Sequence, residues 1–357
     1  MTPAAARFRQ RLGIRHPIIQ APMAGVATPA LAAAVCRSGG LGSLGLGASS
    51  PAQARQMIDE ARAMGAKPLN LNVFCHQPPA PDTDADIAWV ERLAPMFSQF
   101  GASPPRQLKE IYASFLADTD MQALMLEARP TVLSFHFGLP DAHCLARLKE
   151  AGIFLMASAT SLDEAEAIEK AGLDAIIAQG IEAGGHRGIF DPTAGDKRLP
   201  TAVLLSQLLA HTHLPVVAAG GIMTGQGIRA ALDLGAAAVQ MGTAFILCPE
   251  SSASPAYRAQ LASDRARHTR LTAALSGRPA RGLLNDFIRQ IERSQGASPA
   301  AYPRAYDVLK QLSAAATRQG STEYNAHWAG QGAPLARALP AAELLKVLVS
   351  EAGLSPD

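Results

Sequence analysis

The sequence predicts an α/β protein, a TIM-type (β/α)8 barrel that carries a helical insertion or cap domain. Short apolar segments alternate eight times with Ala- and Leu-rich segments of helical period, the pattern of parallel strands covered by helices. Glycine pairs follow the sixth and seventh apolar segments, where barrel enzymes place functional loops. The chain has 357 residues and exceeds a typical barrel by about 100 residues, which leaves room for a second unit.

The strands of the first half follow one another in regular order. We expect them at residues 18–23, 41–46 and 69–74. Thr28-Pro29 and Ser50-Pro51 each supply an N-cap and a first-turn proline, so a helix is expected to begin after each of the first two strands. Residues 76–129 then interrupt the alternation, because they are rich in proline and too long for an ordinary connection. We interpret that stretch as an insertion.

The alternation resumes near residue 130 and supplies five more strands. They are expected at residues 132–137, 154–159, 175–179, 216–219 and 238–245. Helices are expected between them, one of them opened by Ser161 with Glu164 at capping-box spacing. The apolar spacing of residues 340–349 predicts a last helix that returns to cover the barrel. A doubly wound open sheet would show the same alternation, but no G-x-G-x-x-G follows the first strand.

The division into domains follows from this count. The barrel, which would bind the cofactor, is assigned to residues 1–75, 130–248 and 320–357, and a mostly helical substrate cap to residues 76–129 and 249–319. The chain is poor in aromatic residues, at 5%, and none of its five tyrosines falls on an expected strand. Four of them lie in the two cap segments: Tyr112, Tyr257, Tyr302 and Tyr306. The surplus length therefore predicts a cap that brings phenols over the barrel.

Composition excludes several function classes. With 32 basic and 30 acidic side chains, the chain offers no electrostatic footprint for nucleic acid or an anionic membrane. The four cysteines are scattered singly without a C-x-x-C pair, and no histidine set has metal-ligand spacing, so we expect no metal. No signal peptide and no apolar run of about 18 residues occur, so we expect a cytoplasmic protein. The sequence leaves the oligomeric state, monomer or homodimer, open.

The strongest ligand signal is a pair of glycine-rich loops after the last two strands. Gly220-Gly221 precedes a helix, and Gln240, Gly242 and Thr243 end the final strand. Glycine lets backbone N–H groups approach an anion closely, and a helix N-terminus favours negative charge. A tight turn is the simpler interpretation of each loop alone. Together, at the positions where barrels bind phosphate, they predict a site for a phosphorylated cofactor.

Two histidines are candidate site residues. His186 lies in a glycine-rich loop after the sixth strand, where an imidazole could transfer a proton or donate a hydrogen bond; a solvated loop histidine is the alternative. His136 lies within the fourth strand, and a satisfied core histidine is as good an interpretation as a functional one.

Further polar side chains converge on the strand ends. Asn70 and Asn72 share one face of the third strand, and with Gln179 they could hydrogen-bond the edge of a heterocycle. Taken singly, a turn residue or a core polar group is the simpler interpretation of each. Tyr302, Tyr306 and Lys310 recur at four-residue steps, which places them on one helical face. A solvent-exposed helix face is the usual explanation for such a set. The more specific alternative is a surface that lines a site for an anionic substrate.

These blocks resemble the nitronate monooxygenases, class I, formerly called 2-nitropropane dioxygenases. The resemblance is carried by Gln20-Ala-Pro-Met-Ala-Gly25, Asn70-x-Asn72, Ser134-Phe-His-Phe-Gly138, residues 172–188, and Ala218-Ala-Gly-Gly221 through Gly242-Thr243. The blocks span most of the chain in the order of the family. The least matched stretches are the insertion and the tail after about residue 319.

The resemblance implies an enzyme that uses noncovalently bound FMN and O₂ to convert alkyl nitronates, such as propionate 3-nitronate, into a carbonyl compound and nitrite. It implies a flavin semiquinone, a role in nitronate detoxification and no need for NAD(P)H. His186 matches the catalytic histidine, and substrate contacts are implied for Tyr112, Tyr257, Tyr302, Tyr306 and Lys310, with His136 as a further candidate. The implied FMN contacts are Met23, Asn72, Gln179, Gly184, Gly220, Gly221, Gln240, Gly242 and Thr243.

Two alternatives stay open at this point. An NAD(P)H:quinone reductase or an enoyl-acyl-carrier-protein reductase would use the same FMN barrel. A flavin-free isomerase would bind a sugar phosphate through the Gly220-Gly221 loop. The physiological nitronate and the use of neutral nitroalkanes are not determined by the sequence.

Overall fold

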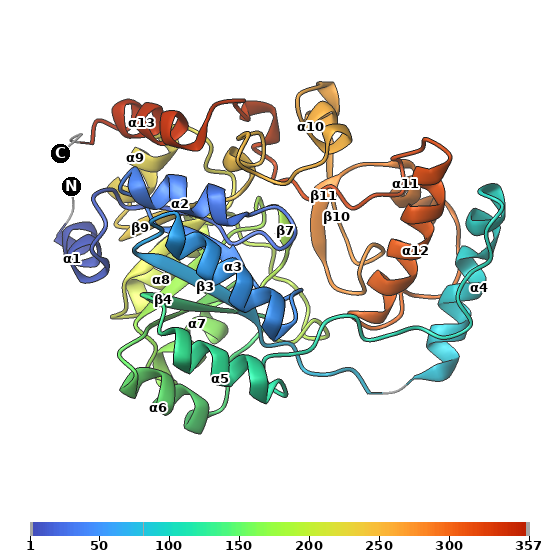
Figure 1. Cartoon of the computed structure of the whole chain (residues 1–357), viewed down its shortest axis with the longest axis horizontal. Coiled ribbons are helices and arrows are strands. Elements are labelled where there is room, and N and C mark those ends of the chain that lie inside the picture. The colour runs from blue at the N-terminus through green and yellow to red at the C-terminus, as the bar shows by residue number, and fades with distance from the viewer. Residues whose placement is uncertain (1–2, 81, 355–357) are drawn as a thin grey trace.

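The structure is a computed structural model that describes residues 3–80 and 82–354. Within these residues, eight parallel strands form one barrel sheet in the order β1-β9-β8-β6-β5-β4-β3-β2 (Figure 1). The strands are β1 Ile18–Gln20, β2 Gly42–Gly45, β3 Leu69–Phe74, β4 Val132–His136, β5 Phe154–Ala159, β6 Ala175–Gln179, β8 Val216–Ala219 and β9 Ala238–Met241. Leu41 closes the ring, because its N–H donates to Ile18 O and its carbonyl accepts from Gln20 N–H, both at 3.0 Å. The predicted barrel is confirmed.

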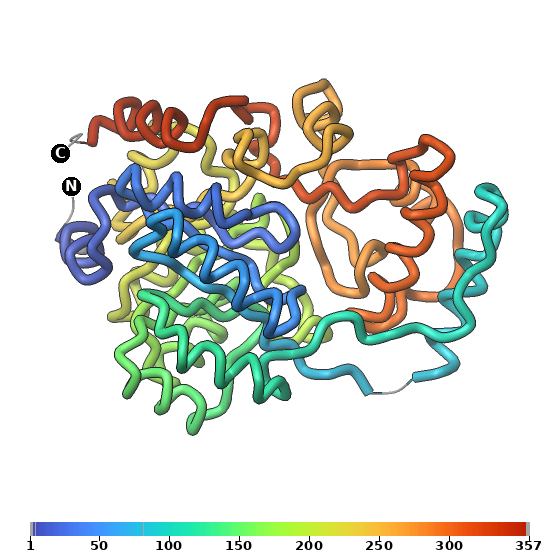
Figure 2. The backbone as a smooth tube through the Cα atoms, viewed as in Figure 1, coloured from blue at the N-terminus to red at the C-terminus, as the bar shows by residue number. Residues whose placement is uncertain are grey.

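A ring of helices covers the barrel. It consists of α2 Pro29–Arg37, α3 Pro51–Ala63, α5 Thr119–Ala128, α6 Ala142–Glu150, α7 Leu162–Lys170, α8 Thr201–His211, α9 Gly225–Asp233 and α13 Ala341–Glu351. The predicted caps are present: Thr28 Oγ1 accepts from Leu31 N–H at 3.0 Å, and Ser50 forms a capping box with Gln53. As predicted, the last helix returns to the barrel, where α13 packs between α2 and α9. Both ends of the described chain therefore lie on the same side of the molecule (Figure 2).

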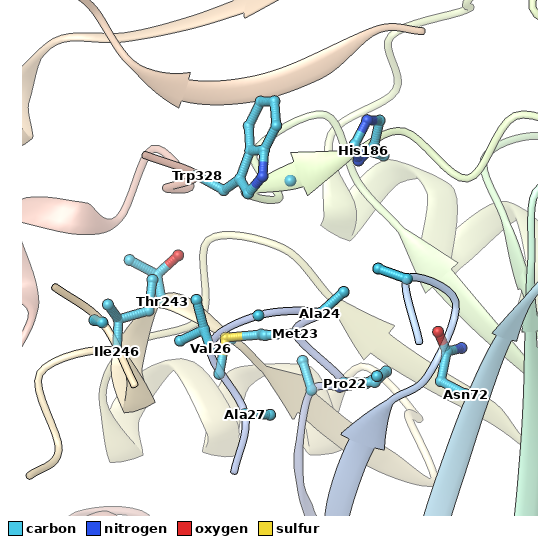
Figure 3. Close-up of a pocket in the computed structure, with 18 of the residues that line it drawn as sticks. Pro22, Met23, Ala24, Val26, Ala27, Asn72, His186, Thr243, Ile246 and Trp328 are labelled. Atoms are coloured by element: carbon cyan, nitrogen blue, oxygen red, sulfur yellow. The ribbon is translucent and has the colours of Figure 1, made fainter. Parts of the chain in front are cut away.

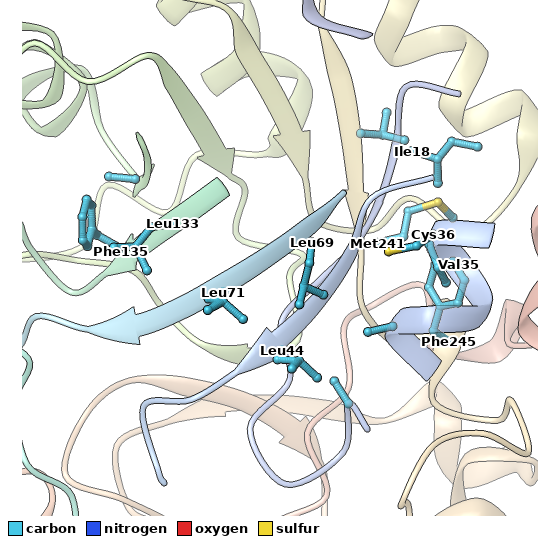
Figure 4. Packing of buried hydrophobic residues seen from close by; sticks show 14 of the residues in the cluster. Ile18, Val35, Cys36, Leu44, Leu69, Leu71, Leu133, Phe135, Met241 and Phe245 are labelled. Carbon is cyan, nitrogen blue, oxygen red and sulfur yellow. The ribbon is translucent and has the colours of Figure 1, made fainter. Parts of the chain in front are cut away.

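Side chains alternate along the strands between the layer of helices outside the barrel and the inside of the barrel. Leu71 on β3 packs outward with Leu44 and Leu133 against the helices (Figure 4). Asn70 and Asn72 point the other way and hydrogen-bond inside the barrel to Ser43 and Ser134. At the amino ends of the strands the barrel interior is apolar, and α1 Pro3–Leu12 closes it. The rings of Phe8 on α1 and Phe154 lie 5.9 Å apart between centroids. Polar groups are thus concentrated toward the opposite, carboxyl end of the strands.

A second unit stands beside that end and has a hydrophobic core of its own (Figure 1). It contains α4 Thr83–Gln99, β10 Thr269–Thr272, β11 Ala280–Leu283, α11 Asp286–Arg293 and α12 Arg304–Arg318. The expectation of a mostly helical segment at residues 249–319 missed β10 and β11. Two further details differ from the expected division: α5 packs against α3 and α6 in the barrel ring, and Tyr324 contributes to the second core. The domain boundaries themselves stay a prediction.

Several strand ends also differ from the sequence expectation, each for a local reason. The first strand ends at Gln20, two residues before Pro22, which has no N–H to donate to a ladder. The last ends at Met241, because residues 243–245 turn into the 3-10 helix η1 Thr243–Phe245. The fourth ends at His136, because Phe137 has a left-handed φ of 75°. An unpredicted strand, β7 Gly185–His186, pairs with β11.

No helix in the described part of the chain is long and apolar enough to cross a lipid bilayer.

Candidate active site

A cavity of about 930 Å³ lies at the carboxyl ends of the barrel strands, between the barrel and the second unit. Figure 3 shows His186 and Trp328 on one side of it and Met23, Pro22 and Asn72 on the other. Asn70, whose side chain donates to Ser43 inside the barrel, does not line the cavity. The cavity brings together all the other site residues expected from the sequence. They are Met23, Asn72, Tyr112, His136, Gln179, Gly184, His186, Gly220, Gly221, Gln240, Gly242, Thr243, Tyr257, Tyr302, Tyr306 and Lys310.

One end of the cavity has the features of a phosphate cradle. Gly220 and Gly221 have φ values of 123° and 71°, a conformation that favours glycine. Among the described residues, no acceptor takes the backbone N–H groups of Gly220, Gly221, Gly242 or Thr243. These groups are therefore free to bind an anion.

The following helix contributes less to this cradle than the sequence suggested. The N–H of Gly225, in the first turn of α9, donates to Glu351 Oε2 at 2.8 Å, and Glu351 is also paired with Arg337. A carboxylate of α13 therefore already occupies part of the positive end of α9.

The middle of the cavity offers amides and small residues. Gln240 Oε1 is buried without a hydrogen-bond partner in the described structure, so it is available to a ligand N–H. Gln179 behaves differently, because its amide is used within the protein: Nε2 donates to His186 O at 2.9 Å and Oε1 accepts from Gly188 N–H at 2.7 Å. Asn72 Nδ2 likewise donates to Ser134. Gln179 thus holds the His186 loop, a role that sequence reasoning missed.

His186 is fixed from several directions. Its strand β7 pairs with β11, its carbonyl accepts from Gln179, and its ring Nε2 lies 2.8 Å from Ser276 Oγ. The ring packs against Trp328 and Tyr302 at centroid distances of 5.1 and 5.5 Å. Burial, reinforced by the neighbouring His136 and Arg278, lowers the pKa of His186 to about 3. The imidazole is therefore neutral near pH 7.

His136 is engaged at both ring nitrogens. Nε2 faces the carbonyl of His186 at 3.1 Å and must carry the proton, because a carbonyl can only accept. Nδ1 then accepts from Ser158 Oγ at 3.0 Å. Burial lowers the pKa of His136 to about 4. The residue lines the cavity, but these contacts make it a support for the His186 backbone.

The cap supplies the far wall. Tyr112 lies 6.4 Å from Tyr302 and 5.9 Å from Tyr306 between ring centroids, and the Lys310 ammonium lies 4.9 Å over the Tyr112 ring. Burial raises the pKa of Tyr112 and of Tyr306 to about 12, so both phenols keep their protons. The buried hydroxyl of Tyr302 has no partner in the described structure.

The expected single helical face was only partly right. Tyr302 precedes α12, whereas Tyr306 and Lys310 lie within it, yet all three reach the same cavity. Tyr257 also lines the cavity, but its polar group is already used within the protein. Its hydroxyl donates to the carbonyl of Trp328, and its ring stacks on that of His327 at a centroid distance of 4.6 Å.

Sequence reasoning missed four residues around His186. Trp328 is one of only two tryptophans and is followed by Gly330 and Gly332, a signal that could have been used. Phe137 packs its ring edge-on to His186 at 5.6 Å and holds Arg278 over its face at 4.4 Å. His76 meets Tyr302 at 4.9 Å, and Ser276 contacts His186 directly. The sequence contains no pattern that would have indicated His76 or Ser276.

The fold and the cavity define a class: a (β/α)8-barrel enzyme with an anion cradle and a neutral histidine in an aromatic chamber at the strand carboxyl ends. Comparison with known proteins gives the family. A sequence model described as nitronate monooxygenase matches residues 6–351. A nitronate monooxygenase of Paraburkholderia phytofirmans is 57% identical over 340 residues, covering 95% of this chain and 93% of the relative. The chain belongs to the nitronate monooxygenase family.

Two solved structures share the fold of this chain. A nitroalkane oxidase from Streptomyces ansochromogenes superimposes with a TM-score of 0.87 at 39% identity, covering 97% of this chain and 98% of that one. FabK from Thermotoga maritima superimposes with a TM-score of 0.75 at 32% identity, covering 97% and 96%.

Proposed function

We propose that this protein is an FMN-dependent nitronate monooxygenase. It would oxidise alkyl nitronates, of the propionate 3-nitronate type, with O₂ to a carbonyl compound and nitrite, and so serve in nitronate detoxification. One observation carries the proposal: a single cavity joins the Gly220–Gly221 cradle to a chamber that contains neutral His186, three phenols and the Lys310 ammonium. Membership of the family supports the reaction class.

The residues present fit FMN. The unpaired N–H groups of Gly220, Gly221, Gly242 and Thr243 suit a phosphate dianion. The orphaned Gln240 Oε1 suits an N–H on a heterocycle edge. When bound, the flavin supplies the electron transfer between nitronate and O₂. The chain contributes binding, orientation and control of protons.

The chamber fits an anionic, delocalised substrate. The free Tyr302 hydroxyl can donate to a nitro oxygen, and the exposed ammonium of Lys310 at the chamber wall favours a negatively charged molecule. His186 is neutral and can either hydrogen-bond the substrate or accept the α-proton of a neutral nitroalkane. Trp328 and Tyr302 limit water around that ring.

The test begins with the visible spectrum of the purified protein, followed by acid release and chromatography of the chromophore. We expect bound FMN, and anaerobic addition of propionate 3-nitronate should reduce it. A colourless protein that cannot be reconstituted would instead support the flavin-free isomerase.

Stopped-flow mixing with NADH or NADPH distinguishes the proposed monooxygenase from the remaining alternative. The similarity to FabK makes a pyridine-nucleotide reductase the second candidate. Rapid bleaching by NADH, with no response to a nitronate, would overturn the proposal in favour of that reductase.

A further inference from the structure

The hairpin between β10 and β11 places a buried hydroxyl against the imidazole of His186. Ser276 lies in this hairpin and is fully buried. Its backbone N–H donates to Ala273 O at 3.2 Å, and the adjacent Gly277 N–H donates to the same carbonyl at 2.8 Å. Because β11 also pairs with β7, the segment that carries Ser276 and the segment that carries His186 belong to one small sheet. The contact between their side chains is therefore held by backbone pairing.

The hydroxyl of Ser276 has three neighbours and only one proton. His186 Nε2 lies at 2.8 Å, Arg278 O at 3.2 Å, and Arg278 N–H approaches Ser276 Oγ at 3.4 Å. The Arg278 carbonyl belongs to a buried residue and has no other donor in the described structure. Buried carbonyls left without a donor are rare and costly. The arrangement that satisfies every group directs the Ser276 proton to Arg278 O.

The direction of this hydrogen bond determines which nitrogen of the His186 ring carries the proton. If Ser276 Oγ donates to Arg278 O, it can only accept at its other contact, so Nε2 of His186 must carry the ring proton. Since His186 is neutral, Nδ1 then has a lone pair, and no described residue hydrogen-bonds to it. His136 and Gln179 both act on the His186 backbone carbonyl and leave the ring to Ser276.

We propose that Ser276 is a positioning residue that fixes the Nε2–H tautomer of His186 and keeps Nδ1 unprotonated toward the cavity. A lone pair at Nδ1 can accept the α-proton of a neutral nitroalkane, whereas a preformed nitronate needs no such acceptor. The α-carbon proton passes to Nδ1, the C–H electron pair becomes the C=N bond, and one N=O pair moves to oxygen. The resulting imidazolium keeps Nε2–H on Ser276 and donates Nδ1–H to the new nitronate.

The inference about substrate rests on the proposed function, whereas the tautomer can be measured without turnover. Histidine labelled with ¹⁵N in the holoenzyme reports it, because an unprotonated ring nitrogen resonates well downfield of a protonated one. The His186 signals are identified by their loss in His186→Asn. We expect an unprotonated Nδ1 at pH 7 in the parent protein and a mixture of tautomers in Ser276→Ala. Thr272→Val, which removes another hydroxyl from the same hairpin, should keep the parent pattern.

Kinetics give the second readout. Catalytic histidines forced into the wrong tautomer lose up to about 10⁴-fold in rate, and for the weaker serine contact we expect Ser276→Ala to lower kcat on nitroethane by about 10- to 100-fold. Turnover of the preformed nitronate should change by less than about threefold, since it needs no proton acceptor. If Ser276→Ala fails to fold, Ser276→Cys replaces it in this test. The thiol has a similar volume and forms a weaker hydrogen bond, so we expect kcat on nitroethane to fall below the parent value by less than about 100-fold.

Two results would overturn the role of Ser276: a protonated Nδ1 in the parent protein, or parent-like nitrogen shifts in both Ser276 variants. An equal loss on nitroethane and nitronate would overturn the substrate inference. If neither compound is turned over while the tautomer result holds, the proposed function fails and the role of Ser276 stands.

Discussion

The buried ion pair beneath the His186 loop gives the sharpest stability prediction. Arg187 is 1% exposed and pairs with Asp196, which is 10% exposed, through two hydrogen bonds of 2.9 and 3.0 Å. The same guanidinium donates to the carbonyls of Gln179 and Gly180. Arg187 therefore connects the end of β6 to the loop that follows His186 through these hydrogen bonds.

Asp196→Asn removes the countercharge and leaves a buried cation. Breaking a buried pair from one side costs about 3–5 kcal/mol; because asparagine keeps one acceptor, we expect about 3 kcal/mol. With about 2.1 cal/mol/K of unfolding entropy per residue, a chain of 357 residues would lose about 4 °C in Tm. Chemical denaturation and thermal unfolding of the apoprotein measure both values.

The pH dependence has a defined sign. Burial opposes ionisation of Asp196, but the hydrogen bonds from Arg187 and from Arg198 N–H outweigh it and hold its pKa below the usual value. The pair therefore stabilises the fold above the pKa of an unfolded aspartate, about 3.9, and that contribution is lost as the pH falls through the lower folded value. The matched control is Asp163→Asn, because the Lys197–Asp163 pair of the same loop is 57% and 76% exposed and should contribute under about 1 kcal/mol. Equal effects of the two substitutions would refute the reasoning.

Four further predictions concern the cavity. His186→Asn should lower turnover of nitroethane by about 100-fold or more while FMN stays bound, and full activity on nitroethane would contradict its catalytic role. Gly220→Ala should lower flavin content measured by absorbance, because its Cβ would lie 2.7 Å from Thr201 Oγ1 at a φ of 123°; full occupancy would contradict the cradle. Since the pKa of His186 is about 3, the pH profile of kcat on a nitronate should show no limb from this residue between about pH 5 and 8, and a limb that disappears in His186→Asn would contradict its neutrality. Trp328→Ala should raise KM more than it lowers kcat, since the indole forms a wall beside His186; an unchanged KM would exclude it as a substrate contact.

The barrel could be predicted from sequence because its signals are local. Strand alternation, the Thr28 and Ser50 caps and the glycine pairs each reflect the chemistry of neighbouring residues, and the structure contains them. The strand ends were less predictable, because Phe137 adopts a left-handed conformation that only its packed surroundings explain.

The assembled cavity could be predicted as a set of residues but not as a set of contacts. Gln179 and His136 were expected to face a ligand, yet both also bond the His186 carbonyl, which lies near them only after folding. Ser276 is 90 residues from His186 in the chain, and their contact depends on the pairing of β7 with β11. Such long-range pairing leaves no periodic trace in a single sequence.

The central claim is that the Gly220–Gly221 cradle and the His186 chamber serve one flavin-dependent oxidation. The most direct measurement combines O₂ uptake with nitrite release when the FMN-loaded protein meets propionate 3-nitronate in air without NADH or NADPH. We predict that O₂ is consumed and that nitrite and a carbonyl compound accumulate over many turnovers. An FMN-loaded protein that releases no nitrite and consumes O₂ only when NADH is present would contradict the account.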